Sequence, residues 1–221
     1  MKDPNDLLAV KQGSSMRFFG YMPQNDSISM HLLLSFDTQL FFLINHAPHT
    51  WWADLAAEAF SGFGYAWILW LIISIILFIR KERKDHWFWV PLGIAAGLCY
   101  IISECALKNW FGRFRPDSLD GAMIVGTIPA SFSFPSSHAV VAFAFAYLFS
   151  RKEVHWKWMY TLAVLVCLSR IYLGHHYPFD VLGGAVFGIV IGVGSQWIDA
   201  IIHHVHQRVF HRPSKRQRKT V

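Results

Sequence analysis

The chain has few cysteines, and its first 30 residues do not resemble a secretory signal; both features narrow the classes of protein that we expect. It contains 3 cysteines, Cys99, Cys105 and Cys167, all inside apolar segments. An odd number in such surroundings excludes a disulfide framework and a CxxC metal site, so we interpret them as packing residues. Residues 1–30 hold aspartates and prolines but no apolar core of the kind that a signal peptide needs. We therefore expect membrane insertion to depend on internal segments.

A nucleic-acid-binding motif is also missing, although the chain is basic. The net charge is +6, and much of it lies in the C-terminal tail, 203–221. A basic tail on a soluble protein can indicate nucleic-acid binding, but no aromatic-interleaved basic surface accompanies this one. Beside a membrane span, such a tail is typical of a cytoplasmic anchor that touches anionic headgroups. We predict a cytoplasmic tail and no nucleic-acid partner.

Long apolar segments are what the chain has in excess. Hydrophobic residues make up 54% of it and its mean hydropathy is +0.33, against about 45–50% apolar residues in a typical soluble domain. A membrane helix needs roughly 20 apolar residues, and we predict five spans, of which the third is shorter than this length. The candidate spans are 62–79, 87–107, 138–149, 157–173 and 180–202.

Residues 31–60 leave the number of spans open. Their apolar runs are interrupted by polar residues such as Asp37 and Asn45, so they form either a sixth span or an amphipathic helix in the membrane interface. The mixture of aromatic and polar residues favours the interfacial helix. The sequence thus predicts an all-α, polytopic membrane helical bundle with five to six transmembrane helices. Its predicted parts are an N-terminal segment 1–59, a membrane domain 60–202 and the tail 203–221.

Basic residues in the connections predict the orientation of this bundle. With five spans, the basic segments 80–86, 151–157 and the tail fall on one side, which should be the cytoplasm. The connections 108–137 and 174–179 then share the opposite side. Some basic residues on that side break the positive-inside trend and invite a functional explanation. They are Lys108, Arg113 and Arg115.

These three cations lie in the first of three motifs, Lys108-Asn109-Trp110-Phe111-Gly112-Arg113-Phe114-Arg115-Pro116. The planar fork of Arg115 suits phosphate oxygens, and Lys108 supplies a compact charge. The alternative is that both are ordinary residues extending to the membrane interface.

The second motif, Phe134-Pro135-Ser136-Ser137-His138, is predicted to be a loop that enters a helix. Ser136 or Ser137 can cap the first turn, and the free backbone N–H groups there form an anion site that faces His138. A plain helix cap followed by an interfacial histidine is the alternative.

The third motif runs from Ser169-Arg170 to Asp180. Arg170 ends an apolar span, where an ionisable residue is costly and usually functional. His176 and Asp180 are four residues apart, so the carboxylate can accept a hydrogen bond from the imidazole. This would fix the tautomer and leave the other ring nitrogen free to attack. A structural His–Asp turn is the alternative.

Together the motifs open onto one face and supply cations, two histidines and a carboxylate around a helix start. This inventory fits phosphoryl transfer, where catalysis is mostly positioning and charge stabilisation. No carboxylate cluster indicates a catalytic metal, so we expect no cofactor.

The three motifs resemble the signature of the type 2 phosphatidic acid phosphatase family: Lys-x6-Arg-Pro, Pro-Ser-Gly-His and Ser-Arg-x5-His-x3-Asp. The resemblance covers roughly residues 60–200 and departs at Ser137, which replaces the glycine. Since a serine is small and keeps its backbone N–H, we expect activity to survive.

The resemblance implies a metal-independent phosphatase in which His176 becomes a phosphohistidine and Asp180 orients it. His138 would protonate the leaving oxygen and later activate water. His175 lacks the spacing, and Arg113 is left as a headgroup contact. The phosphoryl oxygens would be held by Lys108, Arg115, Arg170 and the backbone N–H groups of Ser136 and Ser137.

The substrate remains open at this stage. Undecaprenyl or another polyprenyl diphosphate is favoured, with the site on the periplasmic or extracellular side of the plasma membrane. Phosphatidic acid or phosphatidylglycerophosphate is the alternative, followed by lipid A phosphatase or phosphotransferase activity. A non-catalytic lipid-binding protein should lack one of His138, His176 and Asp180, but all three are present. The vanadate haloperoxidases have a similar constellation but are soluble, and the five apolar spans argue against that class.

Overall fold

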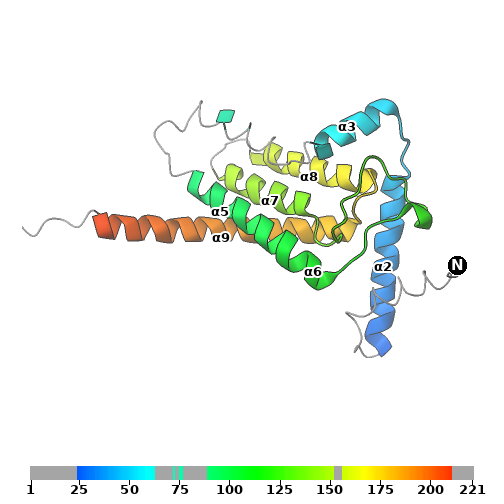
Figure 1. Cartoon of the computed structure of the whole chain (residues 1–221), viewed down its shortest axis with the longest axis horizontal. Helices are drawn as coiled ribbons and strands as arrows, with labels where there is room; N and C mark the ends of the chain where they lie inside the picture. The colour runs from blue at the N-terminus through cyan, green and yellow to red at the C-terminus, as the bar shows by residue number, and fades with distance from the viewer. Residues whose placement is uncertain (1–23, 63–71, 73–74, 77–88, 152–155, 211–221) are drawn as a thin grey trace, which may run out of the picture.

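The structure is a computed structural model that describes residues 24–62, 72, 75–76, 89–151 and 156–210. Those residues form helices and loops, with no strand among them (Figure 1). The helices are α2 (Gln24–Asn45), α3 (Trp51–Gly62), α5 (Trp89–Cys99), the π-helix η3 (Tyr100–Leu107), α6 (Lys108–Phe111), the 3-10 helix η4 (Ser118–Asp120), α7 (Ser137–Ser150), α8 (Trp156–Tyr172) and α9 (Pro178–Phe210). The prediction of an all-α fold is confirmed for this part of the chain.

The structure agrees with some of the predicted spans and does not describe others. Two helical segments, Val90–Phe111 and Pro178–Val205, are long and apolar enough to cross a membrane, whereas Ser137–Ser150 is apolar but shorter. Helix α8 coincides with the predicted span 157–173. Most of the predicted span 62–79 lies outside the described residues, as do the basic connection 80–86, residues 1–23 and the end of the tail. The count of five to six spans stays a prediction.

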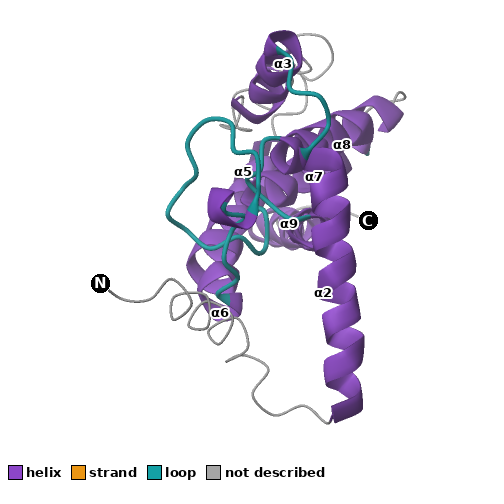
Figure 2. Ribbon diagram, turned by 90° about the vertical axis from the view of Figure 1, so that its right-hand side faces the viewer, coloured by secondary structure: helices purple, strands orange, loops and turns teal. Residues whose placement is uncertain are grey.

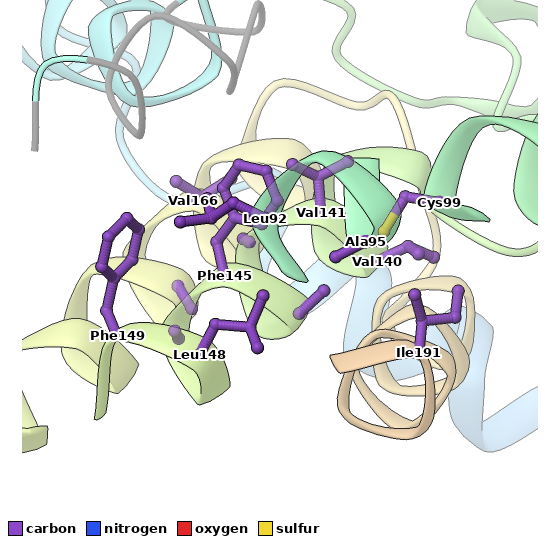
Figure 3. Packing of buried hydrophobic residues seen from close by; sticks show 14 residues of the cluster. Leu92, Ala95, Cys99, Val140, Val141, Phe145, Leu148, Phe149, Val166 and Ile191 are labelled. Atoms are coloured by element: carbon purple, nitrogen blue, oxygen red, sulfur yellow. The ribbon is translucent and has the colours of Figure 1, made fainter. Parts of the chain in front are cut away.

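Helix α7 occupies the centre of the bundle. It is apolar all round, which is typical of a helix buried on every side, and it packs against α9, α8 and α5. Figure 3 shows the side chains that meet there, including Phe145, Leu148 and Phe149 of α7, Val166 of α8 and Ile191 of α9. This core fixes the first turn of α7, and with it the second motif.

Glycines let α9 approach α7 closely. Gly184, Gly188 and Gly192 recur at the four-residue spacing typical of close helix packing in membranes. A Cβ atom at Gly188 would lie 2.3 Å from the Val140 carbonyl oxygen, and one at Gly184 would lie 2.7 Å from that of Ser136. No larger residue fits these positions without moving α7.

Helix α2 runs crosswise to α9 at the end of the bundle, as Figures 1 and 2 show from two directions. Its buried stripe is Asp37, Phe41 and Asn45, spaced four apart so that they share one face. Asn45 binds the 112–136 connection to the end of α8: its amide donates to the carbonyls of Met123 (2.7 Å) and Tyr172 (2.8 Å) and accepts from the Met123 N–H (2.8 Å).

Candidate active site

The three motifs meet at the end of the bundle that α2 crosses. Helix α6 ends at Gly112, whose left-handed backbone (φ 58°) turns the chain toward the site. Beyond that turn, Arg113 binds Asp180 in the first turn of α9, Arg115 binds the His175 carbonyl after α8, and the Ser136 N–H at the start of α7 binds the Asp180 carbonyl. The structure therefore brings all three predicted segments to one face.

His176 lies at the centre, with 1% of its surface exposed. Its Nε2 atom lies 3.0 Å from Nη1 of Arg115. Because a guanidinium can only donate, Nε2 must be the acceptor and the ring proton resides on Nδ1. The tautomer that the sequence predicted for an attacking histidine is therefore the one that these neighbours favour.

Asp180 is reached from His176 through a serine. The Nδ1 atom of His176 lies 3.4 Å from Ser133 Oγ and 3.7 Å from Asp180 Oδ2, and the Ser133 hydroxyl donates a short hydrogen bond to that same Oδ2. The predicted direct hydrogen bond between His176 and Asp180 is not formed at 3.7 Å, although the two groups stay within ion-pair distance, and Ser133 beside them provides the hydrogen-bonded link. Sequence reasoning missed Ser133, which belongs to no recognised motif.

Arg115 is held rigidly by backbone carbonyls. Its Nε donates to the carbonyl of Ser131 (2.8 Å), Nη1 to that of His175 (2.8 Å) and Nη2 to that of Phe132 (3.3 Å). These acceptors are neutral oxygens, and Asp180 and Glu104 act on the guanidinium only from a distance, so its donors can serve an anion. A cavity of about 340 Å³ opens beside Arg115 and is also lined by Phe114, Ile128 and Ser131.

Lys108 is buried and shares a carboxylate with Ser137. Its ammonium donates to Glu104 Oε1 (2.7 Å) and to Ser131 Oγ (3.2 Å). The Ser137 hydroxyl donates a short hydrogen bond to the same Glu104 oxygen. The residue that replaces the glycine of the motif thus ties the start of α7 to the π-helix that carries Glu104. The π-helix itself had no signal in the sequence, although such insertions often occur at functional sites.

Arg170 and His138 complete the cationic side. Arg170 is buried, donates to the Ser61 hydroxyl of α3 and leaves Nε without a hydrogen-bond partner. The groups that act electrostatically on His138 include Arg170, His176 and Lys108, which places all four in one neighbourhood.

The start of α7 differs from the predicted anion site in one respect. The backbone N–H of Ser136 donates to the Asp180 carbonyl at 3.0 Å, so it is not free for a phosphate oxygen. That contact joins the first turns of α7 and α9. The Ser136 hydroxyl is buried and has no hydrogen-bond partner. Of the two serines, Ser137 is the one that begins the helix itself.

The two adjacent histidines face different surroundings. Nε2 of His175 lies 2.8 Å from the Val125 carbonyl, away from Arg115 and Asp180. Burial, with Arg170 next, lowers the pKa of His175 to about 4. Burial and the Arg115 charge also lower the pKa of His176 well below its usual range. Both rings are therefore neutral, but Nε2 of His175 must carry the proton that it donates to the Val125 carbonyl, whereas Nε2 of His176 accepts from Arg115 and is unprotonated.

Arg113 does not lie where the sequence predicted. We predicted a contact with the lipid headgroup, but its Nη1 donates to Asp180 Oδ1 (2.7 Å) and its Nη2 to Asp37 Oδ2 (2.5 Å). Within the described residues, no group of three His, Cys, Asp or Glu side chains could hold a metal ion.

Comparison with known proteins identifies the family of the chain. Residues 87–205 match the model of the PAP2 superfamily, so the chain belongs to that superfamily and is a phosphatase.

Among its relatives is YbjG of Escherichia coli K12, whose assignment as an undecaprenyl-diphosphatase is provisional. It is 40% identical over 183 residues, which cover 80% of this chain and 90% of YbjG. The decaprenylphosphoryl-5-phosphoribose phosphatase of Mycobacterium tuberculosis is 35% identical over 62% of this chain and 75% of its own. The crystal structure of a transmembrane PAP2 type phosphatidylglycerolphosphate phosphatase from Bacillus subtilis superposes with a TM-score of 0.59, at 25% identity over 91% of this chain and 98% of that one.

Proposed function

We propose that this membrane phosphatase hydrolyses undecaprenyl diphosphate or a closely related polyprenyl diphosphate through a phosphohistidine at His176. One observation carries the proposal: Nε2 of His176 accepts a hydrogen bond from the Arg115 guanidinium at 3.0 Å, so it is unprotonated and lies beside a cation. A nucleophile and a phosphate-binding cation are therefore adjacent, at the end of a bundle that includes two helices able to cross a membrane. The relationship to YbjG supports the diphosphate.

The chemistry follows from these positions. The terminal phosphoryl oxygens bind Lys108, Arg115 and Arg170, and Nε2 of His176 attacks the phosphorus. The bond from phosphorus to the bridging oxygen breaks, its electron pair stays on that oxygen, and His138 donates the proton that neutralises it. Water then gives a proton to His138 as it attacks the phosphohistidine, which releases inorganic phosphate and restores His176. The negative charge of Asp180 stabilises the ring while it is cationic.

The topology that we propose keeps the division into 1–59, 60–202 and 203–221, with five spans and the catalytic end on the periplasmic or extracellular side. In this arrangement α2 lies flat in the interface, because it runs crosswise to the membrane helix α9 (Figure 1). Its outward residues Leu32, Phe36 and Leu43 are 67%, 56% and 74% exposed, opposite its buried stripe. Such a face suits an interfacial helix.

A phosphatidylglycerophosphate or phosphatidic acid phosphatase is the second candidate, and the similarity to the Bacillus subtilis structure favours it. Lipid A is a third possible substrate. The residues at the site contact phosphate, which all these lipids share.

Purified protein in detergent should release phosphate from undecaprenyl diphosphate in the presence of EDTA, faster than from phosphatidic acid or phosphatidylglycerophosphate. Labelled substrate, quenched in alkali, should leave phosphate on the wild type and none on His176→Gln. Loss of turnover on chelation, or full activity in the variant, would overturn the mechanism. A higher rate on a glycerophospholipid would overturn the substrate. Cysteines engineered into 116–130 should react from outside, and reaction only in 212–221 would reverse the orientation.

A further inference from the structure

Arg113 takes no part in the chemistry above, yet it is anchored on both sides. Its two terminal nitrogens bind two different carboxylates, Asp180 on α9 and Asp37 on α2, at 2.7 and 2.5 Å. Both carboxylates are fully buried, and the guanidinium carbon lies 4.3 Å from the centre of the Tyr177 ring. A planar group held by two carboxylates and an aromatic face has one available orientation.

This orientation fixes the carboxylate that faces the nucleophile. Arg113 occupies Oδ1 of Asp180, so the carboxylate plane is set and Oδ2 points to the side of Ser133 and His176. The Tyr177 N–H, at 2.8 Å, binds the same Oδ2. Without Arg113, Asp180 would keep contacts to Oδ2 alone and could rotate about them.

Asp37 acts on Asp180 by two routes. Through Oδ2 it orients Arg113, and through Oδ1 it accepts the backbone N–H of Phe179 at 2.8 Å, one residue before Asp180. It therefore holds both the partner of Asp180 and the helix turn that carries Asp180. Asp37 itself lies 143 residues away in the chain on a helix that crosses the end of the bundle (Figure 2).

We propose that Asp37 and Arg113 are positioning residues for the phosphatase reaction, which orient Asp180 and through it His176. The inference rests on the proposed role of His176. It makes the catalytic geometry depend on how α2 is seated, although α2 contributes no residue to phosphate binding.

Asp37→Asn and Arg113→Lys test the inference. Both should lower kcat about 10- to 100-fold, the cost of misplacing a catalytic group by a fraction of an ångström to 1 Å. KM should change less than threefold, because Lys108 and Arg115 are untouched. Thr38→Ala is the matched control on α2, since its hydroxyl bonds only to Leu34 of the same helix (2.9 Å), and it should retain full kcat.

A double variant distinguishes positioning from general destabilisation. If Asp37 acts through Asp180, then Asp37→Asn in an Asp180→Asn background should cost no further kcat, because residues acting as a unit are not additive. Multiplying losses would overturn the inference, as would unchanged kcat in both single variants.

Two measurements keep these outcomes interpretable. Asp37→Asn should fold, since one carboxylate still balances Arg113, and thermal unfolding in detergent checks this. Arg113→Lys, which keeps the charge and loses the fork, serves if Asp37→Asn does not fold. The phosphoenzyme trap on His176→Gln separates the two hypotheses. A labelled His176→Gln would overturn the proposed function itself, whereas an unlabelled His176→Gln with a fully active Asp37→Asn would overturn only the inference.

Discussion

Replacing Gly188 with alanine should push α7 and α9 apart and lower the catalytic rate, although Gly188 lies inside the bundle and not in the active site. The added Cβ would lie 2.3 Å from the Val140 carbonyl oxygen, and real Cβ contacts stay above 3.0 Å, so α7 and α9 must part locally by about 0.7 Å. Overpacking of this kind costs about 1–3 kcal/mol of stability. Because Val140 is two residues from His138, the shift reaches the site, and a displacement approaching 1 Å costs up to about 100-fold in rate.

Gly194→Ala provides the control for this prediction. Gly194 lies on the same helix, but a Cβ there meets nothing within 4 Å, so the change should leave kcat intact and, if anything, add up to about 1 kcal/mol through helix propensity. Thermal unfolding in detergent and the rate of phosphate release should be measured on both variants. If Gly188→Ala matched Gly194→Ala in both assays, the close approach of α7 and α9 would not be what positions the first turn of α7.

Three further predictions concern the loop and the histidines. His175, with its pKa lowered to about 4, binds a proton on unfolding, so stability should fall as pH drops from about 6.5 toward 4; His175→Asn should flatten this slope in unfolding curves. Since burial and Arg115 also lower the pKa of His176, its neutral form persists below pH 6.5, and a kcat/KM profile falling off near 6.5 through His176 would contradict this. Asn45→Leu leaves two carbonyls and one N–H without their partner, which should cost about 2–4 kcal/mol, while Gln39→Leu on the exposed side of α2 should cost none; equal melting temperatures would refute the anchoring role.

The helices and the clustering of the motifs were predictable, because both depend on local patterns. Apolar segments of span length indicate membrane helices whatever their partners, and spacing within the third motif places His176 just before α9 and Asp180 in its first turn. The connection between α6 and α7 was not predictable. Ser133 reaches Asp180 across 47 residues, and nothing in its neighbourhood marks it. The N–H of Ser136 was predicted to be free, but a carbonyl on another helix occupies it.

Asp37 shows the same limit from the other side. In the sequence, Asp37 interrupts an apolar run, and the free-energy cost of placing its charge in a membrane made a span over residues 31–60 less favourable. The structure shows that Arg113 and the Phe179 N–H compensate the charge. These partners lie 76 and 142 residues away, so a single sequence carries no local signal for them.

The distribution of charge explains why the site should favour a phosphate with two negative charges. Arg113 forms ion pairs with both Asp37 and Asp180, so its one positive charge partly offsets two carboxylates and weakens the repulsion between Asp180 and an incoming anion. On the other side of His176, Lys108, Arg115 and Arg170 face the single carboxylate of Glu104. On this side of His176 the positive charges exceed the negative ones by two, which matches a terminal phosphate group carrying about −1.5 to −2. The carboxylate that orients His176 lies on one side of the ring, and the cations that would bind the phosphate lie on the other. His176 can therefore stay neutral although it is close to both.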